Sequence, residues 1–220
     1  MLALSETGVP RGDLSHSIKV IIFMELRQTI CKCGRLIGTL VIQLCQFCDL
    51  EGEKVVKAAL LVIDMQKHYV FANEEKTRLT LKALEFINAA IALFRQKNLP
   101  VICIQQRNEA AGVVPGTEGF NNIDQLNIVA NDPHIIKTYG NAFNKTNLEE
   151  KLKELAVDTI IITGYCAENC VLSTCRGALD LDKTPIILRN AIASGIPENI
   201  RFVENVNEVI SLGALQVVLG

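Results

Sequence analysis

A chain of 220 residues that is 49% hydrophobic can bury one sizeable core, and its length favours one domain with an appendage. Its 22 basic and 24 acidic residues are scattered and give a net charge of −2, which argues against a nucleic acid or an anionic membrane as partner. Apolar runs fall short of the ~20 residues that span a bilayer, and the first residues do not resemble a secretory signal. We therefore expect a cytoplasmic location, where eight cysteines would be core residues, metal ligands or catalytic thiols.

The first 53 residues lack the pattern of the rest, so we treat residues 1–53 as an amino-terminal extension and residues 54–220 as the main domain. The extension contains two close pairs of cysteines: Cys31, Cys33, Cys45 and Cys48. Four thiolates could hold a structural zinc ion, although the first pair has one intervening residue instead of the usual two. The alternatives are buried cysteines in a β-hairpin, or upstream sequence that precedes a true start at Met24.

From residue 57 onward, short β-rich runs alternate with longer helical patterns, which is typical of an α/β fold with a mostly parallel sheet. The helix over 146–156 should begin with a capping box formed by Thr146 and Glu149. The stretch 107–133 is too long for an ordinary connection and is a candidate binding loop. In chain order, we expect strands over 58–64, 101–105, 134–137, 158–164 and 185–189, and helices over 77–98, 146–156, 170–182 and 197–211.

Three residues that can do chemistry stand at the ends of expected strands. Asp64 ends the first strand, Lys137 ends the third, and Cys170 begins the helix after the fourth. Ligands bind beyond the carboxyl ends of the strands in an open parallel sheet, so we expect these residues to converge at one edge. Each of them alone could equally be a helix cap or part of an ion pair.

Together the three residues predict nucleophilic hydrolysis. A helix N-terminus and the Lys137 ammonium should favour the thiolate of Cys170, which is the nucleophilic form. Asp64 could accept the thiol proton and later deliver it to a leaving nitrogen, while Lys137 holds the pair in place. The backbone N–H groups of Cys166 and Cys170 could form an oxyanion hole.

Three segments resemble the signature segments of the isochorismatase-like cysteine hydrolases, in the same order. They are "LLVIDMQ" (60–66), "KTYGNAFNKTNL" (137–148) and "ITGYCAENCVLSTCRGALDL" (162–181), and the resemblance covers roughly residues 57–212. It implies a Rossmann-like, three-layer α/β/α fold with a triad of Asp64, Lys137 and Cys170. It also implies a cis peptide bond between Tyr165 and Cys166, and a homo-oligomer, either a dimer or a tetramer.

Departures from the family pattern narrow the expected chemistry. Members that hydrolyse nicotinamide carry an Asp-x-His metal site after the second strand, where this chain reads "QQRNE" (105–109), so we expect no active-site metal and no cofactor. Members that cleave isochorismate commonly lack the nucleophilic cysteine, which this chain keeps. Lys67 and His68 replace the usual residues of "DMQNDF" and could alter the pocket entrance or a subunit contact. We expect His68 to be a surface or interface residue rather than a catalyst.

Residues that flank the motifs outline a substrate pocket for a small planar or partly apolar amide. The candidates are Gln66, Tyr69, Phe71, Tyr139, Phe143 and Tyr165, and each aromatic one could equally be a packing residue. Cys103 and Cys175 lie in expected apolar surroundings and should be core residues.

These observations favour a metal-independent cysteine hydrolase that cleaves the C–N bond of a small-molecule amide through a Cys170 thioester. One alternative is a vinyl-ether hydrolase of the isochorismate type. The other is a non-catalytic family member that uses the pocket or an oligomer face as a binding module.

Overall fold

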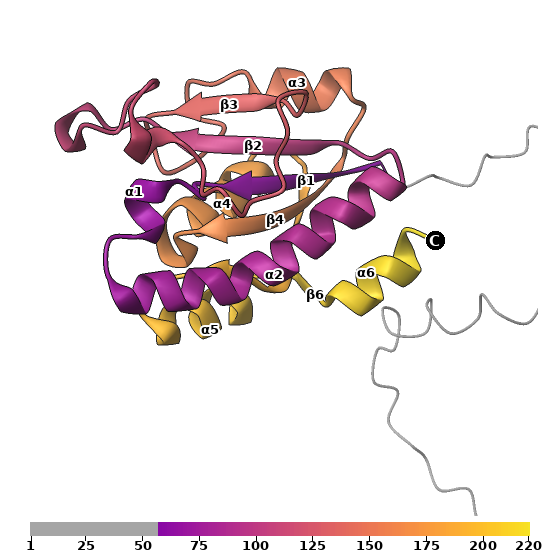
Figure 1. The fold of residues 1–220 in the computed structure, drawn as a ribbon. Helices are drawn as coiled ribbons and strands as arrows, with labels where there is room; N and C mark the ends of the chain where they lie inside the picture. Colours follow the sequence, from indigo (N-terminus) through magenta and orange to yellow (C-terminus); the bar gives the residue numbers. More distant parts are fainter. Residues whose placement is uncertain (1–56) are drawn as a thin grey trace, which may run out of the picture. The chain divides into compact units, whose positions relative to one another are not determined.

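The computed structural model describes residues 57–220 (Figure 1). The expectations for residues 1–53, namely the four-cysteine zinc site, the hairpin and the start at Met24, lie outside the described residues. Across the described part of the chain, no helix combines the length and the apolar character that crossing a membrane requires.

The core of the domain is a six-stranded sheet in which each strand runs parallel to its neighbours. The order β3-β2-β1-β4-β5-β6 is that of a doubly wound Rossmann fold, with β1 at its centre. The sequence prediction of a Rossmann-like, largely parallel sheet is therefore confirmed. The strands are β1 (Ala58–Ile63), β2 (Val101–Gln106), β3 (His134–Lys137), β4 (Thr159–Tyr165), β5 (Thr184–Ala193) and β6 (Val209–Ile210).

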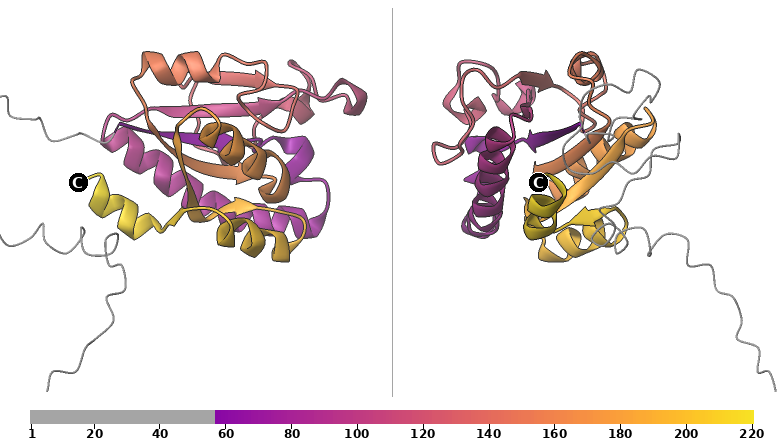
Figure 2. Two further views of the ribbon diagram at one scale, coloured as in Figure 1. Left: turned by 180° about the vertical axis from the view of Figure 1, so that it is seen from behind. Right: turned by 90° about the vertical axis from the view of Figure 1, so that its right-hand side faces the viewer.

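Helices cover both faces of the sheet and complete the three predicted layers (Figures 1 and 2). Alternate residues of β1 point to opposite faces, so Leu60 and Val62 pack in one apolar cluster and Leu61 and Ile63 in the other. Because β1 packs against an apolar cluster on each face, every one of its residues is apolar and buried. On one side lie α1 (Lys67–Val70), α2 (Glu74–Gln96) and α6 (Leu212–Val218), and on the other α3 (Leu148–Glu154), α4 (Leu172–Leu179) and α5 (Pro197–Asn205).

Helices α2 and α3 begin at residues other than those predicted, as does α4, which is described with the site. Helix α2 starts at Glu74 instead of residue 77, because the Asn73 side chain caps it by accepting a hydrogen bond from the Lys76 N–H at 2.9 Å. Helix α3 starts at Leu148, and the capping box predicted at Thr146 is wrong. The Thr146 hydroxyl instead donates to the carbonyl of Ala142 at 2.6 Å, which fixes the loop that leads into the helix.

The carboxyl-terminal part differs most from the prediction. Strand β5 runs to Ala193 instead of ending at residue 189, and α5 ends at Asn205 instead of 211. Strand β6 and helix α6 were not predicted. The two residues of β6 are too few to show a strand period, and α6 is anchored by one buried side chain, Leu215.

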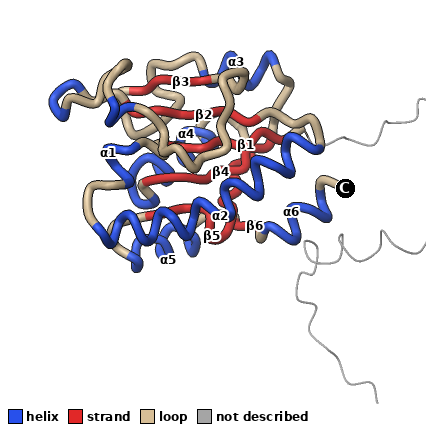
Figure 3. The backbone as a smooth tube through the Cα atoms, viewed as in Figure 1, coloured by secondary structure: helices blue, strands red, loops and turns tan. Residues whose placement is uncertain are grey.

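The long connection between β2 and β3 runs over the sheet edge as a loop with two short 3-10 turns, Glu109–Ala111 and Glu118–Phe120 (Figure 3). The fully buried side chain of Gln66 fastens it to the sheet. The Gln66 amide donates to the carbonyls of Gln106 and Phe120 at 3.1 and 3.0 Å, and accepts from the Gln106 N–H at 2.8 Å. The connection is therefore held at the carboxyl ends of β1 and β2.

Candidate active site

The carboxyl ends of β1 to β4 face the same edge of the sheet, next to α1 (Figure 1). Asp64 directly follows β1, and its backbone adopts a left-handed conformation with φ of 50°, which turns the chain out of the sheet. Its N–H donates to the carbonyl of Ile104 in β2 at 2.9 Å. Asp64 is 2% exposed, so the end of β1 places a carboxyl group in a buried site.

Lys137 ends β3 and is 1% exposed, which is rare for an ammonium unless it is paired. Its Nζ donates to Asp64 Oδ2 at 2.8 Å, to Gln106 Oε1 at 2.5 Å and to Cys170 Sγ at 3.2 Å. These three contacts match the three protons of an ammonium. The structure therefore brings Asp64, Lys137 and Cys170 together, although 73 residues separate the first two in the chain.

Gln106 was not assigned a side-chain role by the sequence analysis, which read residues 105–109 only for the metal motif that they lack. Its side-chain oxygen accepts one Lys137 proton, while its backbone is held on both sides by the Gln66 amide. The signal that could have revealed it is its place at the end of β2, between the strands that end in Asp64 and Lys137.

Cys170 lies in a π-helical turn, Ala167–Val171, and α4 follows directly at Leu172. The prediction that residue 170 begins the helix was therefore wrong, because the helical backbone starts earlier, at residue 167. π-helical turns are rare and occur frequently at functional sites. Among the four cysteines of residues 57–220, Cys170 is of intermediate exposure and the other three are buried, so Cys170 is the most accessible of them.

The electrostatics of Cys170 differ from the sequence expectation. Burial and the negative charge of Asp64 raise the pKa of the thiol to about 12, and Lys137 lowers it only in part. Burial also raises the pKa of Asp64, again against the opposing effect of Lys137. Both shifts oppose a negative charge in the site, and with a pKa of about 12 the side chain of Cys170 rests as a thiol at neutral pH.

The segment before Cys170 has an unusual backbone. The peptide bond between Tyr165 and Cys166 is cis, at the position that the sequence resemblance implies. The carbonyl of Cys166 accepts hydrogen bonds from the N–H groups of Asn169 and Val171 at 3.1 and 3.2 Å. These bonds shape the turn that carries Cys170. The oxyanion-hole role of the Cys166 and Cys170 N–H groups remains a prediction.

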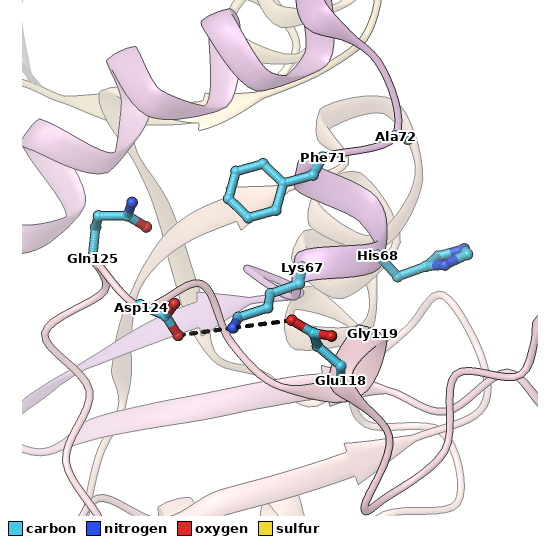
Figure 4. Close-up of a pocket in the computed structure, with 8 residues that line it drawn as sticks. All are labelled: Lys67, His68, Phe71, Ala72, Glu118, Gly119, Asp124 and Gln125. Atoms are coloured by element: carbon cyan, nitrogen blue, oxygen red, sulfur yellow. Dashed lines mark ion pairs between the residues drawn. The ribbon is translucent and has the colours of Figure 1, made fainter.

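The six residues predicted to line a substrate pocket fall into different environments. The Gln66 side chain is buried and hydrogen-bonded to the backbone, so it anchors the long connection. Tyr139 is 42% exposed, and its hydroxyl accepts a hydrogen bond from Lys145 Nζ at 3.0 Å. Phe71 is 47% exposed, directly follows α1 and lines the separate groove of Figure 4. Phe143 packs against the same apolar cluster as Cys170. The Tyr69 and Tyr165 rings stack at 6.4 Å between their centroids, with 18° between their planes.

A separate open groove of about 760 Å³ lies between α1 and the residues after the second 3-10 turn (Figure 4). Lys67 crosses it, with Nζ 3.0 Å from Asp124 and 3.8 Å from Glu118. His68 is exposed at its rim, in line with the expected surface position. No member of the triad lines this groove, whose walls are Lys67, His68, Phe71, Ala72, Glu118, Gly119, Asp124 and Gln125.

The remaining described cysteines have ordinary packing roles. Cys103 and Cys175 are each 1% exposed, which confirms the prediction that they are core residues. Burial raises the pKa of both thiols to about 12. Within residues 57–220, no group of three or more His, Cys, Asp or Glu side chains has an arrangement that could hold a metal ion.

The chain is similar to known proteins in sequence and in fold. Residues 58–206 match the model of the isochorismatase domain. An isochorismatase family protein of Bacillus subtilis is 32% identical over 142 residues, which are 63% of this chain and 74% of that protein. Enterobactin synthase component B of Escherichia coli is 28% identical over 150 residues, covering 62% and 53% of the two chains. The crystal structure of N-carbamoylsarcosine amidase from Thermoplasma acidophilum is 26% identical, with a TM-score of 0.63, over 70% of this chain and 96% of that one.

Proposed function

Because the chain belongs to the isochorismatase family of hydrolases, we propose that it hydrolyses the C–N bond of a small amide through a thioester on Cys170. One observation carries this proposal: a single buried ammonium, that of Lys137, bonds both the Asp64 carboxylate and the Cys170 sulfur. A base and a nucleophile that share one cation need little rearrangement to react.

The first half of the reaction forms the thioester. Asp64 takes the proton from the Cys170 thiol as the sulfur attacks the carbonyl carbon of the amide. This transfer moves the negative charge from the carboxylate to the sulfur and leaves the net charge of the triad unchanged. Lys137 stays bonded to both groups and stabilises either distribution of charge. The reaction therefore needs no free thiolate in the resting protein, and it can proceed although the pKa of Cys170 is raised.

Collapse of the tetrahedral adduct completes thioester formation, and hydrolysis of the thioester is the second half. The carbonyl oxygen becomes an oxyanion, for which the N–H groups of Cys166 and Cys170 are the proposed donors. Protonated Asp64 gives its proton to the leaving nitrogen, and ammonia or an amine departs. Asp64 then takes a proton from water, the hydroxide attacks the thioester, and the thiolate that is expelled recovers the proton from Asp64. A carboxylic acid is left.

An amide fits the unused hydrogen-bonding capacity of the site. Asp64 Oδ2 accepts from Lys137, but Oδ1 is buried and has no hydrogen-bond partner among residues 57–220. A buried carboxylate oxygen without a donor is costly, and the N–H of an amide substrate would supply one. A vinyl ether has no such donor, and its hydrolysis needs an acid and a water but no thiol. For these reasons we favour C–N cleavage over the isochorismate-type reaction.

The test is a screen of purified protein against amides, ureas and carbamoyl compounds, with ammonia and acid release as readouts. We expect turnover with at least one of them, an acyl adduct on Cys170 by mass spectrometry, and a loss of about 10³-fold or more in kcat/KM for Cys170→Ala. Because no metal takes part in the proposed steps, activity should persist in the presence of chelator. Cleavage of isochorismate by Cys170→Ala at the wild-type rate would favour the vinyl-ether alternative. Absence of turnover with every compound would favour the binding module.

A further inference from the structure

The hydroxyl of Tyr69 is a second polar group near the triad without a hydrogen-bond partner. Its oxygen is shielded from solvent and has no partner in good hydrogen-bonding geometry among the described residues, although the Asn108 side chain lies nearby. Buried tyrosine hydroxyls usually find a partner. A phenylalanine would fill the same volume without leaving a polar atom unsatisfied. The hydroxyl therefore calls for an explanation beyond packing.

The fold places this phenol beside the reacting groups. Tyr69 lies on α1, five residues after Asp64, and its ring contacts two other rings. It stacks on Tyr165, which directly precedes the turn that carries Cys170, and it meets His68 edge-on at 5.0 Å between ring centroids. These two contacts fix the plane of the ring. The hydroxyl is thus held in one place by groups that belong to the same edge of the sheet.

The surroundings of the phenol keep its proton in place. Burial, followed by the negative charges of Asp64 and the Cys170 sulfur, raises the pKa of Tyr69 to about 12. The hydroxyl is therefore a hydrogen-bond donor throughout the neutral range. Because the charges of Asp64 and Cys170 act on the phenol, it lies near these two groups.

A ligand could displace the Asn108 side chain, which lies beside the Tyr69 hydroxyl on the long connection between β2 and β3. The side chain of Asn108 lowers the pKa of Tyr69 in part, so its amide lies against the phenol. However, the Asn108 oxygen accepts from the Ala111 N–H at 3.2 Å, and Asn108 is an exposed residue that caps a short 3-10 turn. A ligand can take the place of this exposed amide without disturbing a helix, a strand or the apolar core.

We propose that Tyr69 determines specificity, by donating a hydrogen bond from its hydroxyl to an acceptor atom on the acyl part of the substrate. The inference rests on the proposed function, in which Cys170 attacks the amide carbon and Asp64 Oδ1 faces the amide nitrogen. The preferred substrate class is then a small amide that carries a second acceptor, such as a ring nitrogen or a carboxylate, away from the scissile bond. Amides whose remainder is purely hydrocarbon would leave the phenol unpaired and bind less tightly.

Binding to Cys170→Ala protein, in which no turnover interferes, tests this inference with two matched pairs of probes. Nicotinamide and benzamide differ by a ring nitrogen, and succinamate and butyramide differ by a carboxylate in place of a methyl group. For at least one pair, calorimetric titration should show the acceptor-bearing member binding about 3- to 10-fold more tightly, as one hydrogen bond provides. Adding Tyr69→Phe should reduce this preference to less than about 2-fold and leave the affinity of the hydrocarbon member unchanged.

The matched control is Thr80→Val in the same Cys170→Ala background. Thr80 also has a buried hydroxyl without a partner in the described part of the chain, but it lies in the core-facing side of α2. This variant should keep the full preference. A preference that survives Tyr69→Phe, or equal binding within both pairs, would overturn the inference. Because binding is measured without turnover, the failure of the proposed hydrolysis would show separately, as absence of product from the Cys170 protein.

Discussion

At the scale of single residues, Cys170 is a protonated thiol rather than the activated thiolate that the sequence predicts. Sequence reasoning treated Lys137 as a group that lowers the pKa of Cys170, which holds for a thiol in water next to an ammonium. In the structure the ammonium is shared with Asp64, whose charge opposes the effect, and the sulfur is largely buried. Reactivity must then come from proton transfer during attack rather than from a thiolate that exists beforehand.

This difference predicts a specific pH dependence of alkylation. With a pKa of about 12, Cys170 should react with iodoacetamide about tenfold faster for each pH unit between 7 and 10, because the thiolate fraction rises by that factor. It should still be the first of the described cysteines to react, since the other three are buried. Asp64→Asn should speed the reaction at pH 7, because the charge that raises the pKa is gone. Mass spectrometry of tryptic peptides measures each site, and a rate already constant between pH 6 and 8 would instead indicate a preformed thiolate.

At the scale of elements, β4 approaches β1 so closely that only a glycine fits at its end. A Cβ atom on Gly164 would lie 2.1 Å from the carbonyl oxygen of Ile63 and 2.6 Å from its nitrogen, and φ at Gly164 is +113°. The pairing of β4 with β5 also shifts its register between Ile162 and Gly164. This irregular end of β4 leads directly into the turn that bears Cys170.

We therefore expect Gly164→Ala to lower the free energy of unfolding by about 3 kcal/mol or more, because backbone atoms cannot move aside as a flexible side chain can. Urea denaturation measures the change. Gly213→Ala is the matched control: its Cβ would meet nothing within 4 Å, and it lies inside α6, where alanine should add about 0.4–1 kcal/mol. Equal stability of the two variants would show that the close approach in β4 is relieved at no cost.

Some elements could be predicted from the sequence and others could not, because only some leave a recognisable pattern of residues. Runs such as Ala58–Ile63 were recognisable because a strand buried on both faces must be apolar throughout. The triad was predictable because parallel strands end at a common edge. The start of α2 at Glu74 depended on a single cap, and β6 pairs through only two residues, so neither left a periodic signal. Gln106 and the Tyr69 hydroxyl became visible only through contacts that the fold creates.

At the scale of the whole molecule, everything that the proposed chemistry requires lies within residues 57–220. The strand that begins the sheet, β1, starts at Ala58, and the carbonyl of Lys57 accepts from the Asp158 N–H at 3.2 Å. We predict that residues 54–220 form an independent folding unit, with the boundary that the sequence pattern indicates.

A chain shortened to residues 54–220 is expected to unfold within about 3 °C of the full chain, and to hydrolyse the same amides at the same rate. Thermal unfolding and the ammonia assay, run side by side on both chains, provide the comparison. Metal analysis of the same samples would assign any zinc to the extension if it is found only in the full chain. A shortened chain that aggregates or loses activity would show that the domain boundary is misplaced.

One feature of the sheet also governs how the activity depends on local motion. Lys137 is carried by β3, a strand of four residues that, within residues 57–220, pairs only with β2. Strands at the edge of a sheet open and close far more often than strands at its centre, because local opening costs only a fraction of the free energy of global unfolding. Each opening would withdraw the shared cation and leave the acid and the sulfur uncoupled while the rest of the domain stays intact. The fraying of this margin, rather than melting of the core, would then set the upper temperature at which the protein can work.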